Sequence, residues 1–134
     1  MKKRILIIDD EPHFTIGVQS NLESTGNYQV EVVNDASEAV DRIRELKPDL
    51  ILLDIVMPKV EGADIMDAMK EDPELRDIPV LVVTAMIGPD DAPDRDGVVK
   101  FGDRTLIAKP VTTETLIRCI EEQFSGKIEP QSQE

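Results

Sequence analysis

The sequence of 134 residues is poor in cysteine, histidine and aromatic side chains. Its single cysteine, Cys119, cannot form an internal disulfide, so the fold does not depend on an oxidising compartment. No Cys/His cluster is present that would bind zinc. With three Phe, one Tyr and no Trp, the chain also lacks the aromatic platforms on which nucleic-acid bases stack.

Positive charge and long apolar runs are scarce as well. Against 15 Lys and Arg stand 28 Asp and Glu, which gives a formal net charge of −13. This charge repels nucleic acid and anionic membrane surfaces, so we expect no direct binding to either. The first apolar run, Ile5 to Ile8, is too short for a signal peptide or a membrane span. We therefore expect a cytoplasmic domain whose length suffices for a proper core.

Short apolar runs alternate along the chain with segments of helical periodicity. Strands are predicted at Ile5 to Ile8, Tyr28 to Val32, Leu50 to Leu53, Val80 to Thr84 and Thr105 to Ala108. Helices are predicted over Pro12 to Ser24, from caps at 34–37 to Leu46, over Ala63 to Lys70, and from Thr112 or Thr113 to Gly126. Strands that alternate with helices predict a doubly wound α/β fold, with a parallel sheet covered on both faces.

Two segments depart from this alternation. Gly88 to Gly97 is rich in Pro, Gly and Asp where a fourth helix is due, so we predict at best a short or irregular helix from Pro93 to Phe101. Residues 126–134 are polar and contain one proline. They predict a C-terminal tail or truncated linker after a domain that spans residues 1–125.

The stretch from Leu50 to Gly62 begins with a predicted buried strand, and the carboxylate of Asp54 follows directly at the end of that strand. A strand-end aspartate by itself is more often a cap or a turn residue. Other predicted strands, however, end at Asp9 and Asp10, at Thr84, and at Lys109. Because the carboxyl ends of parallel strands share one edge of a sheet, we expect these side chains to converge.

The residue types at this edge predict a particular chemistry. Carboxylates held within about 4 Å repel each other by several kcal/mol in a low-dielectric setting, unless a cation lies among them. Hard oxygen ligands favour magnesium. A lysine ammonium and a threonine hydroxyl are instead suited to the oxygens of a phosphoryl group. The pattern therefore predicts a phosphate-binding site beside a Mg²⁺ ion.

These motifs resemble the receiver domains of two-component response regulators. The matching positions are Asp9-Asp10, Asp54 within Leu-Asp-Ile-Val-Met-Pro, Thr84-Ala85, Lys109-Pro110, and the glycines Gly62 and Gly102. The resemblance covers about residues 3 to 125, and its motifs occur in the family's order. It implies a five-stranded parallel sheet of order 2-1-3-4-5 with helices on both faces.

The resemblance also implies a mechanism. Asp54 is expected to accept a phosphoryl group from the phosphohistidine of a sensor histidine kinase or phosphotransfer protein. Mg²⁺ is expected to be held by Asp10, Asp54 and the backbone carbonyl of Val56, and by Asp9 through water. Lys109 is expected to pair with a phosphoryl oxygen, and the Thr84 hydroxyl to move onto another. This shift would pass the signal to a downstream protein effector that the sequence does not identify.

Departures from the family pattern keep one alternative open. Leu106 stands where the family often has Tyr or Phe, and together with the irregular fourth helix it gives some weight to a phosphorylation-independent pseudo-receiver as the alternative function. The presence of every site residue argues against that alternative. Val56 occupies the position where phosphatases of the haloacid dehalogenase type need a second Asp, which argues against that class. Val56 and Met86 are both apolar and cannot orient a water, so we predict slow self-hydrolysis of the phosphorylated state. We expect a monomer or a weak homodimer.

Overall fold

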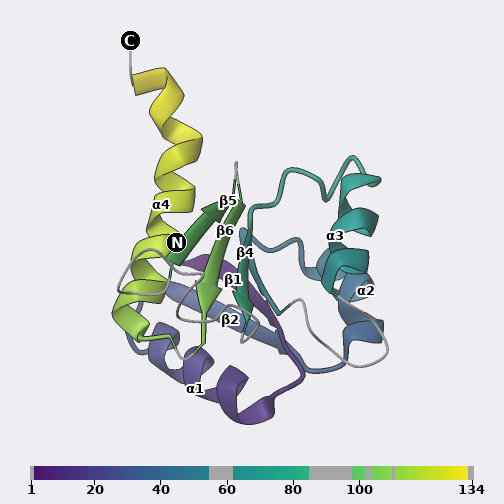
Figure 1. The fold of residues 1–134 in the computed structure, drawn as a ribbon, viewed down its shortest axis with the longest axis horizontal. Coiled ribbons are helices and arrows are strands. Elements are labelled where there is room, and N and C mark those ends of the chain that lie inside the picture. Colours follow the sequence, from purple (N-terminus) through teal and green to yellow (C-terminus); the bar gives the residue numbers. More distant parts are fainter. Residues whose placement is uncertain (1, 55–61, 85–97, 102–103, 110, 133–134) are drawn as a thin grey trace.

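The computed structural model describes residues 2–54, 62–84, 98–101, 104–109 and 111–132. Its strands are β1 (Lys3–Ile8), β2 (Tyr28–Val33), β3 (Leu50–Leu53), β4 (Val80–Thr84), β5 (Val98–Phe101) and β6 (Arg104–Ala108). Its helices are α1 (Pro12–Glu23), the 3₁₀ turn η1 (Ala36–Glu38), α2 (Ala39–Leu46), α3 (Gly62–Lys70) and α4 (Thr113–Ser132). Within these ranges the strands form a single sheet with helices on both faces (Figure 1).

The strands are arranged in the order β2-β1-β3-β4-β6-β5. The first five are parallel, and β6 is the fifth strand along the chain in the predicted scheme. The predicted doubly wound sheet with parallel order 2-1-3-4-5 is therefore confirmed. β5 is an addition that the sequence did not predict, and it pairs antiparallel with β6 at the edge of the sheet.

The prediction of a short helix from Pro93 to Phe101 is wrong for residues 98–101, which form β5. Val98 pairs with Ile107, and Phe101 pairs with Arg104. Two adjacent β-branched residues and an aromatic residue favour a strand, and the outer edge of β6 offers unpaired backbone groups for it to bond. The earlier part of the predicted helix, residues 93–97, lies outside the described residues.

The sheet separates two hydrophobic cores. On one face, alternate residues of the central strands pack against α1 and α4, and this core includes Ile7, Leu52, Val83, Val18 and Ile120. On the other face, the intervening residues pack against α2 and α3, and this core includes Leu6, Leu53, Ile43, Ile65 and Met69. Strand residues that are buried on both faces explain why the sequence shows continuous apolar runs. Cys119 is buried in the first core as a small packed side chain.

The helix boundaries mostly follow the local signals. Pro12 occupies the first turn of α1, and Gly26 just after that helix takes a φ of 82°, which glycine adopts without steric cost. The predicted end of the last helix at Gly126 is wrong, because α4 continues to Ser132. A glycine inside a helix costs only about 1 kcal/mol relative to alanine, so it weakens a helix without ending it. No helix in the described part of the chain is both long and apolar enough to cross a membrane.

Candidate functional site

The carboxyl ends of β1 and β3 bring two buried aspartates side by side. Ile8 and Leu53 are register partners, and the backbone N–H of Asp54 donates to the carbonyl of Ile8 at 3.0 Å. The backbone N–H of Asp9 donates to the carbonyl of Val33 at 3.0 Å. These bonds continue the parallel ladders by one residue beyond the strands. The aspartate side chains are therefore placed by sheet backbone, which is a rigid support for a site.

Lys109 reaches the same edge of the sheet from β6. Its position follows from the pairing of Ala108 with Thr84, the last residue of β4. The Lys109 ammonium donates to Asp9 Oδ2 at 2.7 Å and to Asp54 Oδ2 at 3.4 Å. It also lies 4.3 Å from the centre of the Phe14 ring, in a cation–π contact with α1. Segments one hundred residues apart in the chain thus meet in one cluster.

Glu11 is a fourth member of this cluster that the sequence analysis did not assign to the site. It precedes the first residue of α1, yet its side chain makes no capping hydrogen bond. Its carboxylate instead accepts a hydrogen bond from the Lys109 ammonium at 2.6 Å. The signal was visible as a third consecutive acid after the first strand. No spacing rule, however, separates an acid that faces the site from one that caps the helix.

The carboxylates of Asp9, Glu11 and Asp54 could together hold a metal ion, because one oxygen from each lies within 4.8 Å of the others. The residues Asp9 and Asp54 are only 1% and 6% exposed, whereas the side chain of Glu11 is 62% exposed. Two buried carboxylates and one accessible carboxylate give hard oxygen donors with an open side. This donor set fits a small divalent cation such as Mg²⁺, which keeps part of its water shell when bound.

Burial and charge shift the proton affinities of this cluster. Burial raises the pKa of Asp9 above its ordinary value, although the hydrogen bond from Lys109 acts in the opposite direction. Burial by itself would lower the pKa of Lys109. The hydrogen bonds to Asp9 and Glu11 and the charges of Asp9 and Asp54 outweigh that effect and raise the pKa to about 12. At neutral pH Lys109 is therefore the cation that offsets three carboxylates.

The structure brings Asp9, Asp54 and Lys109 together, as the strand-end argument predicted. Asp10 follows Asp9 and is half-buried, and the carboxylates that meet within 4.8 Å do not include it. Thr84 ends β4 beside Ala108, at the same edge of the sheet, and its side chain is not among the described atoms. Val56 lies outside the described residues. The catalytic and metal-binding roles of all these residues stay predictions.

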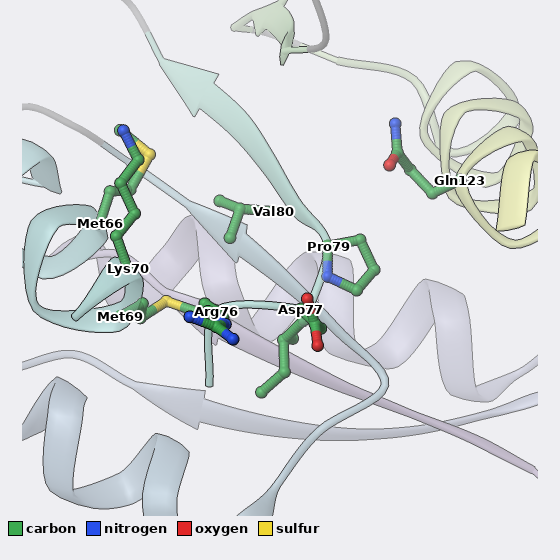
Figure 2. Close-up of a pocket in the computed structure, with 9 residues that line it drawn as sticks. Met66, Met69, Lys70, Arg76, Asp77, Pro79, Val80 and Gln123 are labelled. Carbon is green, nitrogen blue, oxygen red and sulfur yellow. The ribbon is translucent and has the colours of Figure 1, made fainter. Parts of the chain in front are cut away.

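A separate depression lies at the amino end of β4, on the opposite side of the sheet from the carboxyl ends of the strands. It has a volume of about 350 Å³ and is lined by Met66 and Met69 of α3, by Pro79 and Val80 at the amino end of β4, and by charged side chains (Figure 2). Val80 pairs with Ile51 near the start of β3, whereas the acidic cluster follows the end of that strand. The depression therefore takes no part in the chemistry of the cluster.

A parallel sheet with helices on both faces and a buried aspartate at its carboxyl edge is the architecture of a signalling domain of the receiver type. The sequence profile of the response regulator receiver domain matches residues 5–121, and the chain belongs to this family. This domain is the receiver domain of response regulators, which act in two-component signalling. The sheet order agrees with this assignment.

Individual relatives match over most of their length. The chain is 35% identical to protein PilH of Pseudomonas aeruginosa, over 92% of this chain and 98% of that protein. It is 34% identical to the polar-differentiation response regulator DivK of Brucella anthropi, over 90% of this chain and 94% of that protein. The crystal structure of a response regulator from Desulfuromonas acetoxidans superposes with a TM-score of 0.75 at 25% identity, and covers 92% of this chain and 97% of that one.

Proposed function

We propose that this chain is a phosphoacceptor receiver domain in which Asp54 accepts a phosphoryl group from a phosphohistidine. One observation carries the proposal. The Asp54 carboxylate is buried at the carboxyl end of β3, beside Asp9 and 3.4 Å from the ammonium of Lys109. A carboxylate so placed has a cation within reach that can stabilise charge on an incoming phosphoryl group. Membership of the receiver family supports the same role.

The transfer is a displacement at phosphorus. An Asp54 carboxylate oxygen forms the new P–O bond while the P–N bond of the phosphohistidine breaks, and the released imidazole nitrogen keeps the electron pair of that bond. Lys109 then exchanges its carboxylate contacts for a phosphoryl oxygen. Thr84, at the adjacent strand end, donates its hydroxyl to another phosphoryl oxygen. The protein contributes mainly position and charge, which is what phosphoryl transfer requires.

Magnesium is the cofactor that we propose for this reaction. Asp10, Asp54 and the backbone carbonyl of Val56 would hold the ion directly, with Asp9 acting through water. When bound, Mg²⁺ neutralises charge on the phosphoryl oxygens. Asp9 and Asp54 support this choice, because their carboxylates lie close together and offer the hard oxygen ligands that suit Mg²⁺. Glu11 joins the same cluster and competes for Lys109.

We propose that phosphorylation shifts the domain between an inactive and an active arrangement, and that this shift is read by a downstream protein. Leu106, in place of the family's Tyr or Phe, is half-buried in β6 and lies between Val82 of β4 and Val99 of β5 in the sheet. The family's aromatic readout is therefore missing or altered in this chain. The phosphodonor partner is a sensor histidine kinase or phosphotransfer protein in the cytoplasm, and the domain acts as a monomer or weak homodimer.

The proposal is tested by intact-protein mass spectrometry. Wild type and Asp54→Asn are incubated with acetyl phosphate and Mg²⁺, and again with EDTA in place of the metal. We expect one phosphoryl adduct on the wild type with Mg²⁺, and none on Asp54→Asn or in EDTA. An adduct on both proteins would place the phosphate elsewhere. An unmodified wild type would instead support the alternative, a phosphorylation-independent interaction module.

A further inference from the structure

Asn34 follows β2 at the carboxyl edge of the sheet and reaches toward the acidic loop after β1. Its side-chain nitrogen Nδ2 donates to the backbone carbonyl of Asp9 at 2.8 Å and to the hydroxyl of Thr15 at 3.1 Å. Asp9 is 1% exposed and Thr15 is fully buried, whereas Asn34 itself lies at the surface. One surface amide thus satisfies two buried acceptors beside the site.

Thr15 extends this connection into α1. Its hydroxyl donates to the carbonyl of Pro12 at 3.0 Å, in the first turn of the helix. The end of β2, the loop after β1 and the start of α1 are therefore joined by side-chain hydrogen bonds. Within the loop, the backbone N–H of Glu11 donates to Asp9 Oδ1 at 2.9 Å. This last bond joins the Asp9 side chain to a residue two positions later. Its geometry therefore depends on the position of the Asp9 backbone.

We propose that Asn34 is a positioning residue, which with Thr15 holds the backbone of Asp9 so that its carboxylate faces Asp54 and Lys109. The part of this inference that concerns Mg²⁺ rests on the proposed function, and the part that concerns the loop does not. Asn34 touches no reacting atom. It acts through the backbone of Asp9, in the way that outer partners orient the ligands of a metal.

The physical reason lies in the charge of the cluster. Asp9, Glu11 and Asp54 repel one another when Lys109 is drawn toward a phosphoryl group, and a loosely held loop would relax by moving Asp9 away. The loop must be held before the metal binds, because ordering it afterwards would cost part of the binding free energy. Losing an outer partner of a metal ligand typically weakens metal binding 10- to 100-fold. Asn34 acts through the backbone of Asp9, and Asp9 would contact the ion through water, so we expect an effect at the low end of this range, about 10-fold.

The first test needs no metal. Hydrogen exchange of the Glu11 amide is measured by NMR in EDTA for the wild type, for Asn34→Leu, which keeps the side-chain shape without the donor, and for a control. The control is Gln19→Leu, since the side-chain amide of Gln19 also donates to a backbone carbonyl, in this case that of Val30 in β2 at 2.9 Å, away from the site. We expect faster Glu11 exchange in Asn34→Leu only. Equal exchange in the two variants would overturn the positioning role.

The second test measures Mg²⁺ affinity by isothermal titration calorimetry. We expect a Kd about 10-fold higher in Asn34→Leu and in Thr15→Val. Thr15→Ser keeps the hydroxyl, and we expect it and Gln19→Leu to bind as the wild type does. A wild type that does not bind Mg²⁺ would refute the proposed function and leave the exchange result to decide the positioning role. A wild type that binds, with Asn34→Leu binding equally well, would refute the positioning role alone.

Discussion

Replacing Lys109 with Met tests whether the Lys109 ammonium stabilises the folded protein by offsetting the charges of the neighbouring carboxylates. The variant keeps an unbranched stem against Phe14 but removes the ammonium that contacts Asp9, Glu11 and Asp54. In EDTA at pH 7 it leaves the three carboxylates without their cation. We therefore expect a lower free energy of unfolding, although the volume of the side chain hardly changes.

The magnitude follows from the pKa of Lys109. A rise from 10.5 to about 12 corresponds to about 2 kcal/mol that favours the charged, folded form. Solvent screens the exposed Glu11, so we expect a loss of about 1–2 kcal/mol. Since the folded pKa lies above the unfolded one, this stabilisation is fully present below about pH 10 and disappears as the pH rises through 12. Neutral pH is therefore the right condition for the comparison.

Two conditions separate this electrostatic loss from a packing loss. The pKa of Asp9 in the folded protein is raised above its ordinary value of 3.8. The loss of stability caused by its buried charge therefore becomes smaller as the pH decreases toward that value. The deficit of Lys109→Met should therefore shrink at acidic pH. It should also shrink on addition of Mg²⁺, because a divalent cation replaces the missing charge and stabilises the state that binds it.

The assay is urea unfolding followed by circular dichroism, at pH 7 and pH 5, with EDTA or Mg²⁺. The matched control is Lys3→Met, because the Lys3 ammonium also lies over an aromatic ring, that of Phe124 at 4.7 Å, but remote from the acidic cluster. The difference in unfolding free energy between Lys3→Met and the wild type should be the same at both pH values, with EDTA or with Mg²⁺. A Lys109→Met deficit that stays constant under all four conditions would refute the charge-compensation reasoning.

Three further outcomes are expected. Glu11→Gln should raise the rate of phosphorylation by acetyl phosphate several-fold, because Lys109 loses a competing carboxylate at 2.6 Å; an unchanged or lower rate in stopped-flow assays would contradict this. Tyr28→Phe should lose about 1 kcal/mol of unfolding free energy, because the buried hydroxyl donates to Glu121. Burial, and then Glu121, raises the pKa of Tyr28, so wild-type stability should fall above about pH 10 and that of the variant should fall less. With apolar Val56 and Met86, the aspartyl phosphate should persist for minutes, and decay within seconds by phosphate release would disprove the predicted slow hydrolysis.

Much of the fold was readable because local patterns and tertiary requirements agree. Apolar runs such as Ile5 to Ile8 are buried on both faces of the sheet, and such burial is the reason that they show no alternation. Pro12 marked the start of α1 by a local backbone preference. The edge strand β5 escaped prediction because its strand-favouring residues at 98–101 follow a segment rich in Pro and Gly where a helix was expected, and only the pairing with β6 makes them a strand.

The sequence by itself determined the class of the domain and three residues of the charged cluster at the carboxyl ends of the strands. Asp9, Asp54 and Lys109 each follow a recognisable strand, and parallel strands end at the same edge of a sheet. Only the tertiary structure showed that the Glu11 carboxylate accepts a hydrogen bond from Lys109, and that the Asn34 side chain donates to the backbone carbonyl of Asp9. Those contacts depend on side-chain direction and on strand register, which are fixed when the layers pack. The alternation of strands and helices can be read from the residues, and the resemblance to receiver domains implied the strand order, whereas the partner of each carboxylate is decided by three-dimensional proximity.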